Sequence, residues 1–269
     1  MARGMSLHIG LNRIDPAHYG GEGTLFGCHN DARDMEAMAK ELGYETAPQL
    51  LDEAATVTGV KAAINAASAQ LRAGDVFFMT YSGHGGQVPD GNGDEAADPL
   101  GGTGDAKDET WCLFDRMLTD DELYTLYGGF LQGVRVIVLS DSCHSGTVTR
   151  NLGTVGRFLG KSTLDRVYKE HTAEYDAVQS GYPARDRMRI GASVALISGC
   201  MDNQTSADGD GNGRFTEKLK GVWNGGQFQG TLERLRSEIV QSMPADQTPQ
   251  YSMVGEPDRV FEKSRAFAI

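Results

Sequence analysis

The chain has 269 residues, a formal net charge of −12 and 39% apolar residues, which is enough for one large globular domain with a sizeable core. Such an acidic chain argues against nucleic acid as a partner and favours a cation or a basic substrate. The sequence has neither an apolar run of the roughly 18 residues that span a membrane nor an N-terminal stretch typical of a signal peptide. Its four cysteines lack the spacing of zinc sites and the density of a disulfide framework, so we expect a reducing, cytoplasmic location without membrane contact.

The predicted elements alternate between strands and helices along the chain. Strands are expected at 6–12, 44–51, 75–81, 134–139, 193–198 and 249–254. Helices are expected at 30–42, 56–71, 120–130, 162–179, 215–223 and 231–241, and a loop at 85–110. This alternation predicts an α/β sandwich with a mostly parallel sheet between layers of helices.

The negative charge is concentrated in one glycine-rich segment within this pattern. Residues 90–122 contain eleven acidic and two basic residues. Clustered carboxylates can bind a cation, but a solvated acidic loop has the same composition, and charge alone leaves both interpretations open.

Polar sequences follow three of the predicted apolar strands. DVFFMTY (75–81) leads into SGHGG, VRVIVLS (134–140) into DSCHSG, and SVALIS (193–198) into GCMDNQTSADG. Ligands bind at the carboxyl ends of the strands in parallel sheets of this kind. We therefore expect a histidine, a cysteine and a polar loop to meet at one edge of the sheet.

The histidine and the cysteine at these strand ends have the chemistry of a base and a nucleophile. A thiol attacks a carbonyl as the thiolate, and an imidazole can take its proton and later protonate the leaving amine. Alone, Cys143 would be interpreted as a buried small side chain and His84 as a hydrogen-bonded polar residue; together they favour a catalytic dyad. His144 is a rival base, but adjacent residues on a strand point to opposite faces.

Asp141 lies two positions before Cys143, and residues i and i+2 of an extended strand share a face. A carboxylate on the face of the nucleophile would attract an arginine or lysine side chain of a substrate. We therefore interpret Asp141 as a residue that selects the bond to be cleaved, not as a third catalytic group.

The order YSGHGG followed by DSCHSGT resembles the metacaspases and bacterial orthocaspases, which are caspase-like cysteine peptidases of family C14 in clan CD. The resemblance extends to GCHNDARDM at 27–35, DDEL at 120–123 and SGCMDNQTSADG at 198–209, and it covers nearly the whole chain. The animal caspase signature Q-A-C-[RQG]-G is absent. The resemblance implies the caspase–haemoglobinase fold, a three-layer sandwich around a mostly parallel six-stranded sheet. It also implies a single catalytic domain over 1–269, with a large-subunit-like region at 1–150, a linker at 151–190 and a small-subunit-like region at 191–269.

The resemblance also implies roles for individual residues. His84 would be the general base and acid and Cys143 the nucleophile, with the backbone N–H groups of Gly85 and Cys143 stabilising the oxyanion. The matching motif positions imply an acidic pocket for the P1 residue, the one before the cleaved bond, lined by Cys28, Asp31, Ser82 and Asp141.

One pocket carboxylate allows another interpretation, and two further aspartates are candidate subsite residues. The carboxylate of Asp31 could serve only as a favourable charge at a helix N-terminus. Asp202 and Asp208, in the loop after the third apolar strand, are weaker candidates for further subsites.

Calcium is the one cofactor that the resemblance implies. Type I metacaspases are commonly activated by calcium, and the matching carboxylates are Asp108, Asp120 and Asp121, whose oxygen atoms suit this cation. Arg150 stands seven residues after Cys143, where the family often has another acidic ligand. Loss of the site therefore stays open as an alternative, and no other cofactor is expected for the chemistry.

Together these features predict a monomeric cysteine endopeptidase that cleaves protein or peptide substrates after Arg or Lys through an acyl-enzyme. Basic residues in the linker match this preference, so self-cleavage there is a further hypothesis; its alternative is a helical insertion that covers the sheet. Two other functions remain open: a catalytically silent caspase-like scaffold, and a clan CD peptidase with another P1 preference. The intact dyad argues against the first, and the carboxylates of Asp31 and Asp141 argue against cleavage after aspartate.

Overall fold

The computed structural model of the chain describes residues 2–91, 107–143, 155–182, 188–201, 204, 206–209 and 211–269. Its strands are β1 (Gly4–Gly10), β2 (Glu45–Thr46), β3 (Leu50–Leu51), β4 (Val76–Ser82), β5 (Gly85–Pro89), β6 (Lys107–Cys112), β7 (Met117–Thr119), β8 (Arg135–Asp141), β9 (Ser193–Ser198) and β10 (Gln250–Gly255). Its helices are α1 (Pro16–Tyr19), α2 (Cys28–Glu41), α3 (Val57–Gln70), α4 (Asp120–Gly128), α5 (Lys161–Glu170), α6 (Thr172–Ser180), α7 (Arg214–Trp223), α8 (Leu232–Ser242) and α9 (Arg259–Lys263).

The central sheet has the strand order β10-β9-β8-β4-β1-β2, and β3 also pairs with β1. Strands β1, β4, β8 and β9 are parallel, and β10 runs antiparallel to β9. Strands β2 and β3 pair with successive parts of β1, so the strand predicted at 44–51 is one interrupted edge strand. Seven strands thus fill six positions, which confirms the predicted mostly parallel six-stranded sheet.

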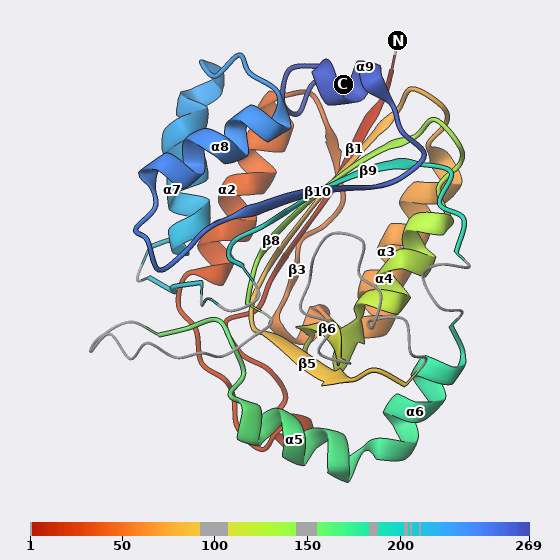
Figure 1. Cartoon of the computed structure of the whole chain (residues 1–269), viewed down its shortest axis with the longest axis vertical. Helices are drawn as coiled ribbons and strands as arrows, with labels where there is room; N and C mark the ends of the chain where they lie inside the picture. The colour runs from red at the N-terminus through yellow and green to blue at the C-terminus, as the bar shows by residue number, and fades with distance from the viewer. Residues whose placement is uncertain are drawn as a thin grey trace.

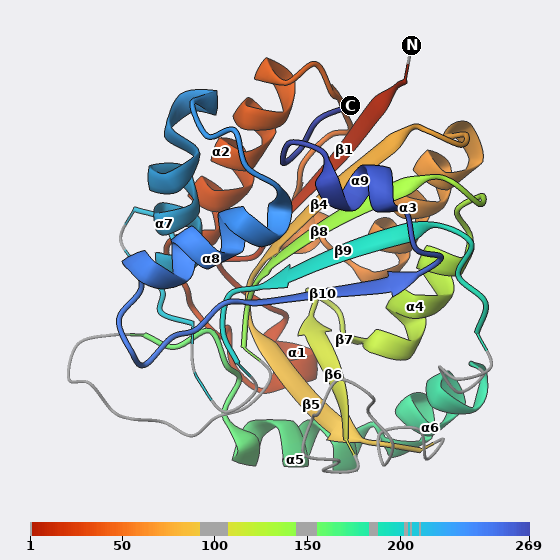
Figure 2. The ribbon, with the colours of Figure 1, turned by 45° about the horizontal axis from the view of Figure 1, so that its top comes forward.

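Helices cover both faces of this sheet, as Figures 1 and 2 show. On one face, α3 and α4 pack on the strands through buried residues such as Ile64 and Leu126, and on the other α2, α7 and α8 do so through residues such as Met35. Phe77 of β4 belongs to the first apolar cluster and Phe78 to the second. This alternation is that of a strand buried on both faces, and the three-layer sandwich is confirmed.

A second sheet, antiparallel and with the order β5-β6-β7, shows that the prediction of a loop over 85–110 was wrong in part. The segment lacks the apolar alternation of a half-buried strand, because glycines open β5 and charged residues open β6. Its strands form through pairing with one another, which local composition does not reveal. Since β5 begins three residues after the end of β4, this sheet borders the carboxyl edge of the central one.

The predicted helix at 162–179 is two helices, α5 and α6, which meet at His171, a residue with a non-helical backbone. The short helices α1 and α9 were not predicted. Among the helices of the described ranges, none is both long enough and apolar enough to cross a membrane.

Candidate active site

The carboxyl ends of β4 and β8 lie side by side at the centre of the sheet. Ser82 pairs with Asp141 in the parallel register, and His84 and Cys143 each follow two residues later. Both are buried, with exposed fractions of 6% and 0%. Gly85 allows the two segments to approach closely, because a Cβ atom at this position would lie 2.0 Å from the carbonyl oxygen of Cys143. The sequence-predicted base and nucleophile therefore come from adjacent strand ends.

The tautomer of His84 follows from the hydrogen bond of its Nε2 atom. Its Nε2 lies 2.8 Å from the carbonyl oxygen of Gly23, and because a carbonyl only accepts, Nε2 carries the proton of the neutral ring. Nδ1 is buried and has no hydrogen-bond partner within the described part of the chain, so its lone pair can take a proton. Burial lowers the pKa of His84 to about 4 and keeps the ring neutral at pH 7. Gly23, at a positive φ of 53°, was missed by sequence reasoning.

The thiol of Cys143 lies among groups from the loop that follows β9. Its Sγ is 2.7 Å from Sγ of Cys200 and accepts a hydrogen bond from the backbone N–H of Ser206. The hydrogen bond with Cys143 and burial raise the pKa of Cys200 well above its usual range, so Cys200 stays a neutral thiol. Sequence reasoning placed this loop at the same edge of the sheet but singled out neither Cys200 nor Ser206.

A short segment of the linker, Val155–Leu159, crosses these strand ends. The carbonyl oxygen of Arg157 accepts hydrogen bonds from the backbone N–H groups of Gly85, at 2.9 Å, and Cys143, at 3.3 Å. These are the two donors that the family resemblance implies for the oxyanion, and here they hold the carbonyl of a residue of the same chain.

Backbone hydrogen bonds hold the segment on both sides of Arg157. Before it, Gly156 forms an antiparallel bridge with Ala207, and the N–H of Arg157 donates to the carbonyl of Ser206 at 2.9 Å. After it, Phe158 forms a parallel bridge with Gly85. The carbonyl of Gly85 accepts a hydrogen bond from the N–H of Leu159 at 3.1 Å. In β-augmentation, an extended peptide binds by pairing with the edges of strands in this way.

The guanidinium of Arg157 enters the pocket that was predicted for a P1 side chain. Arg157 is fully buried, and its Nη2 lies 2.7 Å from Oδ2 of Asp31 and 2.9 Å from Oδ1 of Asp208. Its Nη1 lies 3.0 Å from Oδ2 of Asp141 and donates to Oγ of Ser82 at 2.8 Å. Burial alone would lower the pKa of Arg157, but the carboxylates, that of Asp141 most strongly, hold it well above the usual value.

Two of these carboxylates are fixed from behind by donors of the loop after β9 and the start of α7. Asp141 accepts from Oγ of Ser206 at 2.6 Å and from Oγ1 of Thr216 at 2.9 Å. Asp31 accepts from the N–H of Gly213 at 3.0 Å. Burial raises the pKa of Asp31, while the charge of Arg157 acts in the opposite direction. The pocket is thus assembled from α2, β4, β8 and this loop.

Two glycines border the guanidinium, and sequence reasoning missed both. A Cβ on Gly213 would lie 2.4 Å from Cζ of Arg157, and one on Gly27 would lie 3.0 Å from its Nη2. Cys28, the fourth predicted pocket residue, is fully buried at the start of α2, and burial raises its pKa to about 12. A signal was present for Gly27, which is the first residue of the quoted motif GCHNDARDM, whereas Gly213 lies four residues after the end of SGCMDNQTSADG.

The three aspartates that the resemblance implies as calcium ligands lie at one end of the small sheet. Asp108 is on β6, and Asp120 and Asp121 open α4, directly after the pair Thr110–Thr119 of β6 and β7. Asp108 and Asp121 are fully buried, and buried carboxylates offer the oxygen donors that calcium prefers. The residues fit a calcium site in this respect. Arg150 lies outside the described residues.

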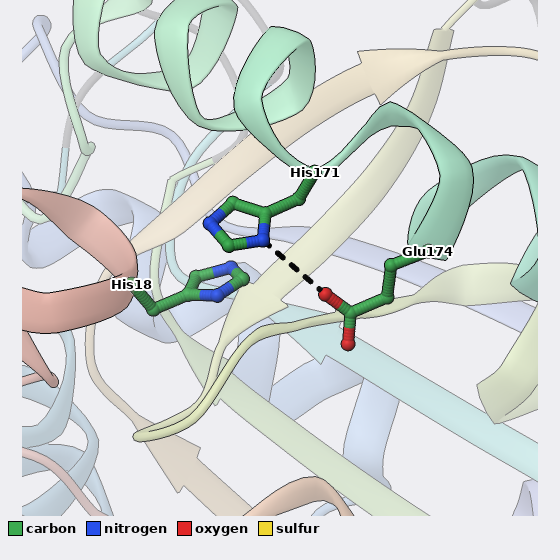
Figure 3. A group of neighbouring side chains, drawn as sticks. All are labelled: His18, His171 and Glu174. Atoms are coloured by element: carbon green, nitrogen blue, oxygen red, sulfur yellow. Dashed lines mark ion pairs between the residues drawn. The ribbon is translucent and has the colours of Figure 1, made fainter.

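A different group of side chains in the described ranges has potential metal-ligand atoms close together. Atoms of His18, His171 and Glu174 lie within 4.8 Å of one another (Figure 3). The two imidazole rings stack with centroids 4.1 Å apart, and Nε2 of His18 is already hydrogen-bonded to the hydroxyl of Tyr175 at 2.9 Å. The group joins α1 to the linker helices and contains none of the predicted calcium ligands.

Comparison with known proteins places the chain in a family. The family model described as "Caspase domain" matches residues 9–261, which is nearly the whole chain. The chain therefore belongs to the caspase-domain peptidase family, as the resemblance of its motifs implied.

Its relatives within that family include metacaspases. Metacaspase-1 of Mycosarcoma maydis is 27% identical over 250 residues, covering 78% of this chain and 59% of that protein. Metacaspase-2 of Trypanosoma brucei brucei is 31% identical over 218 residues, covering 76% of this chain and 55% of that protein. The chain thus spans a little over half the length of these relatives.

The solved structure of protein GSU0716 from Geobacter sulfurreducens is similar over the whole chain. It has 45% sequence identity and a TM-score of 0.87, and the match covers 98% of this chain and 97% of that one. This likeness agrees with the caspase-like fold described above.

Proposed function

We propose that this chain is a cysteine endopeptidase that cleaves peptide bonds after Arg or Lys. The observation that carries the proposal is the binding of Arg157, with its carbonyl at two backbone donors and its guanidinium among three carboxylates. A substrate with a basic P1 side chain can form the same contacts. A silent scaffold has no need for a pocket of this charge beside a buried thiol.

The chemistry uses groups that surround the carbonyl of the P1 residue. Nδ1 of His84 takes the proton of the Cys143 thiol, and the sulfur attacks the carbonyl carbon. The N–H groups of Gly85 and Cys143 stabilise the negative oxygen, each worth roughly 3–4 kcal/mol in the transition state. The C–N bond then breaks as His84 returns the proton to the leaving amine. Water, deprotonated by the same imidazole, releases the acyl group.

Fluorogenic peptides that end in Arg, Lys or Asp test this function, with Cys143→Ala as the inactive control. We expect cleavage of the Arg and Lys peptides and none of the Asp peptide. Cleavage of the Asp peptide alone would point to another clan CD specificity. No cleavage of any peptide by either protein would favour the silent scaffold.

We also propose that the chain cleaves itself between Arg157 and Phe158. The contacts of Val155–Leu159 support this bond, and until it is cut the segment excludes other substrates from the pocket. On an SDS gel, wild type should give two fragments that are absent from Cys143→Ala; the same bands in both proteins would contradict self-cleavage. Arg157→Ala should abolish the fragments. Arg166→Ala is the matched control, because Arg166 is another linker arginine and contacts the carbonyl of Tyr19 instead.

Calcium activation is a separate proposal, supported by the burial of Asp108 and Asp121. These residues and Asp120 would hold the ion, which would order the small sheet beside the dyad. Isothermal titration of the Cys143→Ala chain with calcium should show one site that Asp121→Asn weakens. Equal heats in the two proteins would remove Asp121 from the ligand set.

A further inference from the structure

Asp208 contacts Nε of Arg157, a donor at a chain position where lysine has only a methylene group. Its Oδ1 lies 3.3 Å from Nε and 2.9 Å from Nη2 of Arg157. In a lysine side chain of the same path, a methylene group stands at the position of Nε, and the charge is a compact ammonium with three donors. The contact with Asp208 therefore distinguishes the two basic residues.

The remaining donors of the guanidinium are also matched to acceptors. Nη1 faces Ser82 and Asp141, including the backbone carbonyl of Asp141 at 3.1 Å, and Nη2 faces Asp31 as well as Asp208. The five N–H groups of an arginine side chain thus all have oxygen atoms within 3.3 Å. A lysine ammonium cannot reach all of these acceptors at once.

Asp208 cannot turn away to follow a shorter side chain. Its side chain is 1% exposed, its Oδ2 accepts from the N–H of Phe26 at 2.6 Å, and its Oδ1 accepts from the N–H of Gly27 at 3.1 Å. These two bonds fix the carboxylate from behind, as Ser206 and Thr216 fix Asp141. A buried, fixed acceptor that loses its charged donor is costly, and such sites discriminate strongly against ligands that lack the donor.

The close approach of Gly27 and Gly213 to the guanidinium of Arg157 also favours arginine over lysine. Both glycines lie where a Cβ atom would contact the guanidinium, so their backbone forms a slot around a flat group. A planar, weakly hydrated guanidinium fits such a slot, whereas an ammonium loses strongly bound water on entering it.

We propose that Asp208 is the residue that makes this P1 pocket select arginine over lysine. The inference rests on the proposed function, whose pocket would accept both, and it narrows the substrate class to chains with arginine before the cleaved bond. Asp31 and Asp141 supply the negative charge that either basic side chain would use.

Matched peptides that differ only in Arg or Lys at P1 test the proposal by the ratio of their kcat/KM values. In Asp208→Asn, which keeps the size of the side chain but replaces one of its two acceptor oxygens with an NH2 donor, we expect this ratio to fall about ten- to hundredfold, mostly through slower cleavage of the Arg peptide. Asp34→Asn is the matched control, because Asp34 pairs with Asn212 and Lys220 and not with Arg157. Equal losses on both peptides would overturn the role of Asp208 in selection.

A binding measurement separates this inference from catalysis. In a Cys143→Ala, Arg157→Gly chain the pocket is free for N-acetyl-arginine amide and N-acetyl-lysine amide, whose affinities titration calorimetry can compare. We expect at least about tenfold tighter binding of the arginine ligand, and loss of that difference on adding Asp208→Asn. If the wild-type chain cleaved none of the peptides while the binding variant still showed this difference in affinity, the proposed function would fail and the inference would stand. Equal affinities, or no binding of either ligand, would overturn the inference. If Asp208→Asn does not fold, Asp208→Glu, which displaces the charge by one methylene, must reduce the preference in the same direction.

Discussion

The proposed P1 pocket and the surroundings of Glu122 are both buried clusters of charge, but their charges are balanced in opposite ways. Glu122, in the first turn of α4, accepts from Nη1 and Nη2 of Arg116 at 2.8 and 2.9 Å and also pairs with Lys61. One carboxylate therefore faces two cations. In the pocket, three carboxylates face the single cation of Arg157.

This difference in charge balance is expected if the cluster around Glu122 is structural and the pocket around Arg157 is a binding site. The partners of Glu122 belong to the body of the domain, and Glu122 also completes a capping box with Thr119. Burial alone would raise the pKa of Glu122, but Arg116 and Lys61 lower it below the usual value. The pocket obtains its cation from the linker, so a substrate cation can replace it. A surplus of buried charge of one sign thus marks the place where a partner of the other sign binds.

Among the substitutions that test this comparison, Gly213→Ala should have the largest effect on cleavage. The added Cβ would lie 2.4 Å from Cζ of Arg157 and would expel a guanidinium from the pocket. We expect cleavage after arginine to fall about a hundredfold or more. Gly211→Ala is the control, since a Cβ there would meet no atom of the described residues within 4 Å. Equal activity of the two variants would contradict this geometry.

Asp141→Asn should have the next largest effect. The change removes the charge that pairs with Nη1 at 3.0 Å and keeps the shape of the side chain. We expect kcat/KM for Arg peptides to fall between about ten- and hundredfold, while the unfolding temperature is retained. Unchanged kinetics would take Asp141 out of the pocket.

Glu122→Gln should act on stability and leave specificity alone. The two cations would lose their common partner in a buried site, which costs about 3 kcal/mol of unfolding free energy. Urea unfolding in the Cys143→Ala background measures this loss without interference from self-cleavage. If Glu122→Gln instead changed the ratio of Arg to Lys cleavage, the distinction between the two clusters would fail.

The smallest effect is one of pH on self-cleavage. His84 must be neutral to accept the thiol proton, and its pKa of about 4 keeps it neutral well below the usual value of 6.5. The rate should therefore hold from pH 7 downward and fall only near pH 4. The rate is measured from fragment formation, with circular dichroism to verify that the chain stays folded. A half-maximal rate near pH 6.5 would show that His84 is not buried during the reaction.

Sequence reasoning predicted the central sheet well because its strands are continuous apolar runs. Strands β4, β8 and β9 fall within one or two residues of their expected bounds. The small sheet was missed because Gly85–Pro89 and Lys107–Cys112 are too polar and glycine-rich to resemble strands. They form strands through their pairing with each other.

Sequence reasoning named many of the side chains that the structure brings together at the candidate site, but it did not name Arg157, which lies among them. The motifs pointed to the segments that carry His84, Cys143 and the pocket carboxylates. Nothing in local sequence indicated that Arg157 would bind there, because its place depends on contacts with residues 51 positions further along the chain. Asp208 was expected only as a subsite residue, since it reaches the pocket through a loop whose path the sequence does not reveal.

The most direct test of the account is the identity of the new chain end after self-cleavage. Intact mass spectrometry and N-terminal sequencing of the wild-type fragments should give one cut, with Phe158 as the new N-terminus, and no cut in Cys143→Ala. A cut after any other basic residue of the linker, with Arg157–Phe158 intact, would contradict the claim that this segment lies in the site as a substrate.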